Sequence, residues 1–161
     1  MRAMGLDLAA KQTNPSGICI IAGEQTESRI YYYDKDILEE IGKINPDIIA
    51  IDAPLSFPSK GFFRHSDVLL QKMGYRPLSP NFKNMKQLVI RARKLAKRLQ
   101  GKYTILEAFP QAAGRIFGLE KGRWESKDRF DAYLCALTAK YYLEGRYEAV
   151  GRQRIILPKS V

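Results

Sequence analysis

A run of four apolar residues at positions 48–51 constrains the fold of this chain more than any other feature. An uninterrupted apolar run of this length is typical of a strand that is buried on both faces inside a parallel sheet. The preceding residues 36–44 place apolar side chains at helical spacing, begin with a capping-box pattern at Asp36 and Glu39, and stop before Pro46. Because neighbouring parallel strands need a crossover connection, we interpret this segment as a crossover helix and predict an α/β fold.

The hydrophobic pattern along the rest of the chain predicts further strands and helices. Near the N-terminus, consecutive β-rich runs with short connections indicate an antiparallel meander. The expected strands cover residues 2–8, 17–22, 27–33, 48–51 and 103–106. The expected helices cover residues 36–44, 67–73, 84–100, 111–117 and 126–144, and residues 154–157 are expected to pair at a sheet edge.

This order of elements predicts a mixed five-stranded sheet, with three antiparallel strands followed by parallel strands, flanked by helices. The same order of strands and helices occurs in the ribonuclease H-like fold. Alternating α/β orders fit several folds, so the order alone decides little. A length of 161 residues is that of one ordinary domain, so we predict a single domain over residues 1–161. The stretch up to residue 80 that follows the apolar run is rich in Pro, Ser, Gly and Phe, which predicts an insertion at about residues 53–100.

The composition favours an anionic partner in the cytoplasm. Lys and Arg number 27 against 17 Asp and Glu, a net charge of +10, and nucleic acid, either DNA or RNA, is the first expectation for such a chain. Cys19 and Cys135 lie far apart in apolar runs, as expected for reduced thiols in the cytoplasm. No apolar run approaches the ~20 residues of a membrane span, so no membrane partner is expected.

Three carboxylates stand at the ends of predicted strands. Asp7 lies near the end of the first strand, Asp52 directly follows the apolar run, and Glu107 follows the strand at 103–106. The carboxyl ends of parallel strands meet at one edge of a sheet, where the ligand sites of open α/β sheets lie. We therefore expect these three side chains to converge.

A fourth carboxylate is expected to join them from the last helix. Asp131 precedes Leu134, Cys135 and Thr138 at the spacing of one apolar helix face, so its side chain is predicted to point inward. Asp128 lies one turn earlier on the same side and is either an alternative ligand or an acid that favours the helix N-terminus.

Converging carboxylates need a cation, because each pair at ~5 Å repels by roughly 3 kcal/mol at an effective dielectric near 20. Oxygen ligands suit Mg²⁺ or Mn²⁺, and no Cys or His spacing in the sequence suits zinc. Two such ions, ~3.5–4 Å apart, clamp the attacking and leaving oxygens of a phosphodiester displacement. The predicted catalytic and metal-binding residues are Asp7, Asp52, Glu107 and Asp131, with Asp7 as the bridging ligand.

Two further residues are auxiliary candidates with structural alternatives. Lys127 is expected either to contact the scissile phosphate or to be an ordinary charge on the helix surface. His65 is the one histidine of the sequence and is either a base or phosphate contact near the metals or a structural side chain.

The motifs that carry these acids resemble a known family when taken together. Gly-Leu-Asp-Leu-Ala begins at Gly5, Ile-Asp-Ala-Pro-Leu at Ile51, Glu-Ala-Phe-Pro at Glu107 and Asp-Ala-Tyr-Leu-Cys-Ala-Leu-Thr-Ala at Asp131. In this order they are similar to the domain-of-unknown-function 429 family, described as predicted nucleases of ribonuclease H-like fold. The resemblance implies a single ribonuclease H-like domain that is a metal-dependent phosphodiesterase, whose acidic positions are those of the four carboxylates above. A more distant similarity to Holliday-junction resolvases implies a homodimer, because a resolvase cuts two strands symmetrically.

The helix expected at residues 84–100 carries the densest group of cations. We predict that it lies along the phosphate backbone of a nucleic acid, although a solvated amphipathic face would show the same pattern. Arg64, in the insertion, is a further candidate for contact with nucleic acid. The cations of the helix are Lys86, Arg91, Arg93, Lys94, Lys97 and Arg98.

The sequence thus predicts a nuclease that hydrolyses phosphodiester bonds of DNA or RNA with metal-activated water. One alternative is a non-catalytic nucleic-acid-binding domain of the same fold, in which the acids are structural. The other is a nucleotide-binding phosphotransferase related to actin and sugar kinases, which usually shows duplicated domains and Gly-rich phosphate loops that this sequence lacks.

Overall fold

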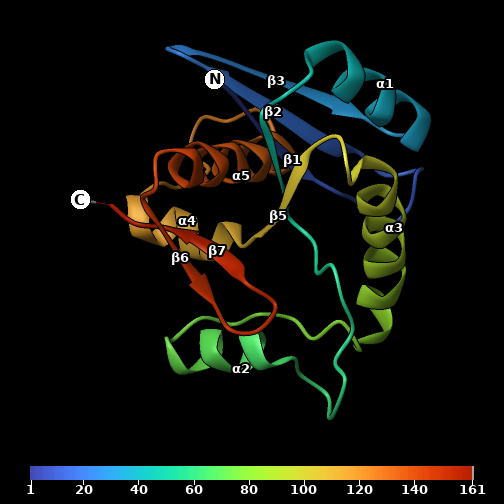
Figure 1. The fold of residues 1–161 in the computed structure, drawn as a ribbon, viewed down its shortest axis with the longest axis vertical. Coiled ribbons are helices and arrows are strands. Elements are labelled where there is room, and N and C mark those ends of the chain that lie inside the picture. Colours follow the sequence, from blue (N-terminus) through green and yellow to red (C-terminus); the bar gives the residue numbers. More distant parts are fainter. Residues whose placement is uncertain (161) are drawn as a thin grey trace.

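The computed structural model describes residues 1–160 and contains one seven-stranded mixed sheet (Figure 1). The strand order is β3-β2-β1-β4-β5-β7-β6, with β1, β4, β5 and β7 parallel to one another and with antiparallel pairing of β2 to β1, β3 to β2, and β6 to β7. The strands are β1 (Arg2–Asp7), β2 (Ser16–Ala22), β3 (Gln25–Tyr31), β4 (Ile48–Ile51), β5 (Thr104–Ala108), β6 (Tyr147–Val150) and β7 (Ile155–Pro158).

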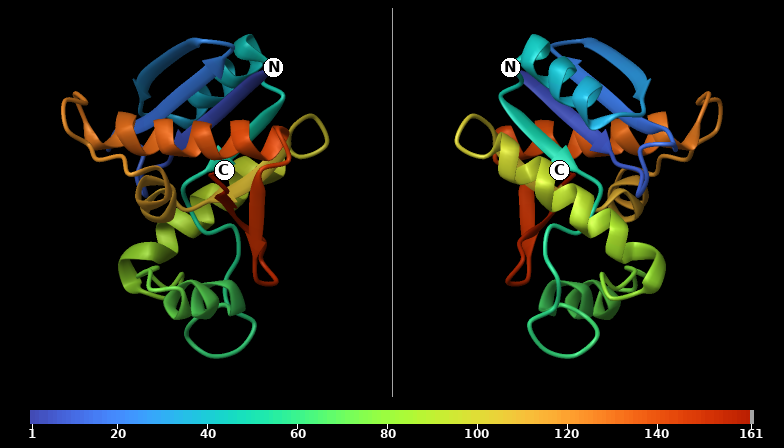
Figure 2. Two further views of the ribbon diagram at one scale, coloured as in Figure 1. Left: turned by 90° about the vertical axis from the view of Figure 1, so that its left-hand side faces the viewer. Right: turned by 90° about the vertical axis from the view of Figure 1, so that its right-hand side faces the viewer.

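Helices cover both faces of the sheet (Figure 2). Helices α1 and α3 pack on one face, where Ile41 and Leu95 meet Leu6 and Ile49 of the strands. Helix α5 crosses the other face, and α4 packs beside it. The helices are α1 (Asp34–Ile44), α2 (His65–Lys72), α3 (Lys83–Leu99), α4 (Pro110–Phe117) and α5 (Lys127–Leu143).

The predicted α/β architecture is confirmed, but the predicted strand count of five is wrong. The structure adds the hairpin of β6 and β7 beside β5. Residues 154–157 were expected at a sheet edge, but β7 is an inner strand. It pairs in parallel with β5 on one side and antiparallel with β6 on the other. Strand β6 lies in a part of the sequence where no strand was predicted.

The segment 53–82 leaves the sheet and carries α2 away from it (Figure 1). The predicted insertion extended to residue 100, whereas α3 in fact packs against the sheet through Ala92, Leu95 and Leu99. Hydrogen bonds between Ser66 and Gln153 join the insertion to the turn between β6 and β7. Within residues 1–160, no helix has both the length and the apolar character that crossing a membrane requires.

Two glycines allow α5 to lie directly on the sheet. A Cβ atom on Gly5 would lie 2.1 Å from the backbone oxygen of Ala132, and one on Gly17 would lie 2.3 Å from the backbone oxygen of Asp128. No real side chain fits at such distances, so the backbones approach because these positions are glycine. This close packing brings the first turns of α5, and with them Asp131, to the end of β1.

Candidate metal centre

Three aspartates from separate segments meet at one edge of the sheet. Asp7 is the last residue of β1, and Asp52 directly follows β4, where its backbone N–H donates to the oxygen of Leu6 over 2.8 Å. Asp131 comes from α5, which lies across these strands. Each aspartate offers a carboxylate oxygen within 4.8 Å of those of the other two. We call these three residues the aspartate triad.

The triad is an electrostatically strained group. Burial, followed by repulsion from Asp52 and Asp131, raises the pKa of Asp7 to about 10. Burial, followed by repulsion from Asp131, raises the pKa of Asp52 to about 7. Burial also raises the pKa of Asp131, against the opposing effect of Lys127. Without a bound cation, at least one of these carboxyls therefore holds a proton near neutral pH.

The only ammonium paired with the triad among residues 1–160 is that of Lys127, whose Nζ lies 3.3 Å from Oδ2 of Asp131. The Lys127 side chain is 80% exposed, so water screens much of its charge. Three ionised carboxylates and one ammonium leave two negative charges, which is the charge that one divalent cation neutralises. Three oxygen donors at this spacing suit Mg²⁺ or Mn²⁺. Asp128 is close enough to contribute to the raised pKa of Asp7.

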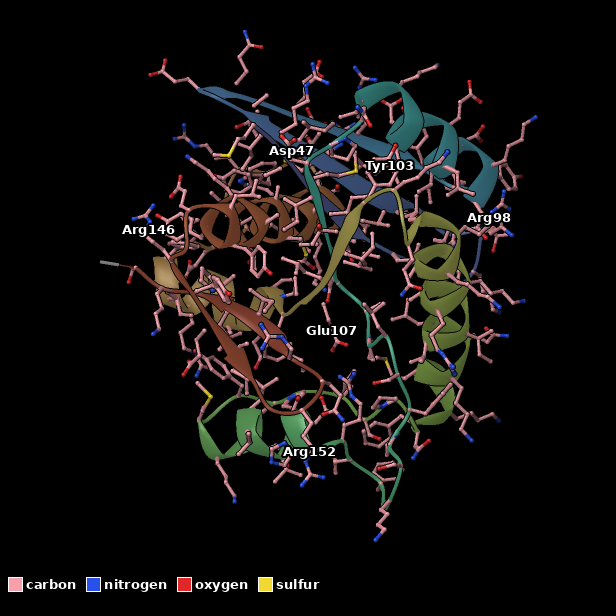
Figure 3. The ribbon with its side chains drawn as sticks, viewed as in Figure 1. Asp47, Arg98, Tyr103, Glu107, Arg146 and Arg152 are labelled. Atoms are coloured by element: carbon pink, nitrogen blue, oxygen red, sulfur yellow. The ribbon has the colours of Figure 1, made fainter. Side chains whose placement is uncertain are left out.

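Glu107, the fourth predicted ligand, is held by a different partner. Its position in β5 is in register with Ile51 of β4, so it stands next to Asp52 at the strand ends. Its carboxylate accepts hydrogen bonds from Nη1 and Nη2 of Arg64, over 2.9 and 2.6 Å, and from the backbone N–H of Leu55 over 2.9 Å. Figure 3 shows the Glu107 side chain extending from the end of β5 toward the insertion. Burial raises the pKa of Glu107, and Arg64 opposes that rise.

Arg64 is buried and fully occupied by protein acceptors. Besides Glu107, it donates from Nε and Nη2 to Asp67, over 2.9 and 3.1 Å, and from Nη1 to Ser56 over 3.3 Å. A guanidinium has five N–H donors, and these bonds use all five. The structure therefore assigns Arg64 to Glu107 and Asp67, and the expected contact with nucleic acid is not supported. We call Arg64, Asp67 and Glu107 the arginine cluster.

His65 makes a contact that fits one of its two predicted alternatives. Its Nδ1 accepts a hydrogen bond from the backbone N–H of Arg152 over 3.1 Å, at the turn that joins β6 and β7. Figure 3 shows Arg152 beside α2. This contact corresponds to the structural alternative for His65, which ties the insertion to the hairpin.

Residues of both groups of acids line one pocket of about 370 Å³. Its lining includes Asp52, Asp131 and Lys127 together with Arg64 and Glu107. Lys127, expected either to contact phosphate or to be an ordinary surface charge, stands where a ligand of the pocket would reach it. The remaining walls come from the insertion, the start of α3 and the start of α4.

The predicted basic helix is exposed on one side. Lys86, Arg93, Lys94, Lys97 and Arg98 are exposed, and Figure 3 shows Arg98 at the outer end of α3. Three of them, Arg93, Lys94 and Lys97, line a groove of about 620 Å³.

Arg91 is the exception on α3, because its side chain points inward. It donates to Asp34 over 2.8 Å and to the backbone oxygens of Ala9 and Tyr32 over 2.6 and 2.9 Å. The inward direction of Arg91 was missed in the sequence analysis, although helical spacing indicates it. Arg91 falls on the same helix face as the apolar residues Leu88, Ala92 and Leu95.

Comparison with known proteins gives a family but no function. A sequence model of the family described as "Protein of unknown function (DUF429)" matches residues 5–122. This range includes Asp7, Asp52 and Glu107 and ends before Asp131. No curated protein matches the chain.

Proposed function

The chain belongs to the DUF429 family, whose description names no function, and we propose that it is a metal-dependent nuclease that hydrolyses phosphodiester bonds of nucleic acid. One observation carries the proposal: Asp7, Asp52 and Asp131 offer oxygens within 4.8 Å of one another although they come from segments far apart in the sequence. The order of β1 to β5 with the α1 crossover supports assignment to the ribonuclease H-like fold, in which acids at strand ends hold metals.

The electrostatics of the triad favour a bound cation over a purely structural role. Structural acids normally have an arginine, a lysine or several N–H donors as partners, as Glu107 has. The triad has one exposed lysine for three carboxylates, and the pKa of each of the three is raised. A divalent cation on Asp7, Asp52 and Asp131 would remove this repulsion.

When bound, a Mg²⁺ or Mn²⁺ ion supplies Lewis-acid stabilisation of phosphate oxygens and makes water more acidic. The protein's own residues supply the remaining functions. Asp7, at the end of β1, would hold the ion together with Asp52 and Asp131. Lys127, which lines the pocket beside Asp131, would be placed to donate to a phosphate oxygen. The exposed cations of α3 hold the nucleic-acid backbone beside the pocket.

A second ion would require a fourth carboxylate. Asp128 beside Asp7, and Glu107 beside Asp52, are the candidates. To bind an ion, Glu107 would first have to break its ion pair with Arg64. The buried guanidinium of Arg64 would then be partly unpaired, which is energetically costly. We therefore propose that one ion binds to the triad first and that Asp128 is the more accessible ligand for a second.

A metal titration combined with a cleavage screen tests the proposal. We expect the wild-type protein to bind Mn²⁺ in calorimetry and to cut at least one of a set of linear, branched, single-stranded and hybrid substrates. Asp7→Asn should remove both Mn²⁺ binding and cleavage, while circular dichroism shows an intact fold. Asp36→Asn, the same chemical change on α1 away from the triad, is the matched control and should leave both unchanged.

The outcome also separates nuclease activity from simple binding. Cleavage that persists in Asp7→Asn would indicate a contaminating enzyme or a different site, and would overturn the proposal. Binding of nucleic acid without any Mn²⁺ affinity in the wild-type protein would instead identify a non-catalytic nucleic-acid-binding domain.

A further inference from the structure

The pocket beside the aspartate triad is larger than the proposed chemistry alone requires. Asp52, Asp131 and Lys127 form one wall of its roughly 370 Å³. This volume lies in the range of about 300–1,000 Å³ that is usual for small-molecule sites. The other walls therefore leave space for an organic group next to the acidic wall.

Part of the remaining wall is apolar. Pro54, Pro77, Leu78, Met85 and Phe109 line it, and Leu78 is 59% exposed although it is a large apolar residue. An inorganic phosphate or a hydrated metal ion gains nothing from such a surface, whereas a flat apolar group does. The pocket thus joins an acidic wall, where a bound cation would attract a phosphate, to a surface that suits an aromatic ring.

Polar groups lie at the rim of this apolar wall. The backbone N–H of Arg76 donates to Oε1 of Gln111 over 2.8 Å, which orients the Gln111 side chain so that its amide nitrogen remains a donor. The exposed Arg76 side chain adds a positive charge at the same rim. Such donors complement the acceptor atoms on the edge of a nucleobase and on phosphate.

We propose that this pocket binds one unpaired nucleotide, with its base on the apolar wall and its phosphate directed to the aspartate triad. The inference rests on the proposed nuclease function and specifies its substrate class, which is a single strand or a strand with an unstacked base.

The shape of the site explains why the strand must be unpaired. The Asp131 side chain is 14% exposed, and Asp7 is not among the residues that line the pocket. A base that is paired and stacked in a duplex has no free face to offer to a concave apolar wall. Enzymes with recessed sites of this kind act on single strands or rotate the target nucleotide out of the stack.

A binding experiment with small probes tests the pocket without relying on turnover. We would measure binding of adenosine and thymidine 5′-monophosphates and of ribose 5-phosphate by calorimetry, with Ca²⁺ in place of Mg²⁺. Stacking of a base on protein side chains usually strengthens binding by about tenfold to a hundredfold. We expect a difference of this size between the nucleotides and the sugar phosphate, and equal affinities would overturn the proposal.

Substitutions locate the effect in the apolar wall. In the double variant Leu78→Ala and Met85→Ala, the preference for nucleotides over ribose 5-phosphate should fall about tenfold, while the affinities for ribose 5-phosphate and Mn²⁺ remain. An unfolded variant would lose affinity for the nucleotides, for ribose 5-phosphate and for Mn²⁺ together, which distinguishes unfolding from loss of the apolar wall. Leu119→Ala is the matched control, because Leu119 is an exposed leucine, at 39%, that does not line the pocket.

Cleavage assays separate failure of this inference from failure of the proposed function. We expect an oligonucleotide to be cut at least about tenfold faster as a single strand than in its perfect duplex. Cleavage of both forms at equal rates, with no nucleotide preference in binding, would overturn the proposal of a nucleotide pocket but support the proposed nuclease activity. A nucleotide preference in binding with no cleavage of any substrate would support the nucleotide pocket but overturn the proposed nuclease activity.

Discussion

The two groups of acids at the ends of β1, β4 and β5 lie side by side and differ in their counter-charge. In the arginine cluster, a buried guanidinium donates to both Glu107 and Asp67. In the aspartate triad, three carboxylates share one lysine whose side chain is 80% exposed. Carboxylates at one edge of the sheet thus serve two purposes: Glu107 joins the insertion to the sheet, and the triad remains available to a cation.

The comparison teaches that position alone does not make a carboxylate a ligand. Glu107 and Asp52 stand on adjacent parallel strands, and burial raises the pKa of both. What distinguishes them is Arg64, which arrives from a segment that is not part of the sheet. The decisive quantity is therefore whether a buried cation of the protein already neutralises the charge.

Removing the guanidinium should have the largest effect on stability. Arg64→Met leaves Glu107 and Asp67 buried without their partner, so we expect a loss of about 3–5 kcal/mol in the free energy of unfolding, measured with urea. The exposed-helix control Arg93→Met should change it by less than about 0.5 kcal/mol. Adding Glu107→Gln to Arg64→Met should recover part of the loss, and no recovery would contradict this account of the arginine cluster.

Separating α5 from β1 should disrupt the triad without touching a carboxylate. Gly5→Ala places a Cβ atom 2.1 Å from the backbone oxygen of Ala132, so the helix must shift. We expect a loss of about 1–3 kcal/mol, as for other overpacked sites, together with loss of Mn²⁺ binding. Gly42→Ala in α1, where a Cβ meets no atom within 4 Å, is the control. Normal Mn²⁺ affinity in Gly5→Ala would show that this packing does not position Asp131.

Acidification should stabilise the metal-free protein through the triad. The pKa of Asp7 is raised to about 10 in the folded protein, so the folded state holds a proton that the unfolded chain releases. Stability then decreases as the pH rises from about 5 to 9, by at most about 1.4 kcal/mol per pH unit for one such group. Thermal unfolding should show this slope in the wild-type protein without metal and a smaller one in Asp7→Asn.

Saturating Mg²⁺ should remove or reverse that dependence, because the cation binds the ionised carboxylates more tightly at higher pH. The same slope in the wild-type protein and in Asp7→Asn would show that other groups produce it.

The smallest effect is expected from the one lysine of the triad. Lys127→Ala removes a competitor of the cation, so Mn²⁺ affinity measured by calorimetry should increase several-fold, consistent with an exposed ion pair of modest strength. Cleavage, where measurable, should decrease because the expected phosphate contact is lost. Unchanged or weaker Mn²⁺ binding would indicate that Lys127 does not shield Asp131. Lys121→Ala, in the loop before α5, is the control.

Much of the fold followed from local patterns. The run at 48–51 and the helical spacing before it correctly predicted β4 and α1, because burial on both faces or on one face leaves a direct record in the sequence. Strand β6 was missed because Tyr147–Val150 is short and mixes polar with apolar residues. The inner position of β7 was missed because strand order depends on which edge is free when the end of the chain docks.

The sequence by itself determined that acids stand at the ends of β1, β4 and β5 and on the inner side of α5, since strand ends and helix faces are local properties. Only the tertiary structure decided which of these acids already has a buried cation of the protein as its partner. Arg64 is 43 residues from Glu107 in the chain, and the two meet because the insertion folds back under β5. A buried charge is governed by its nearest opposite charge in space, and no local pattern records a partner that arrives from so far along the chain.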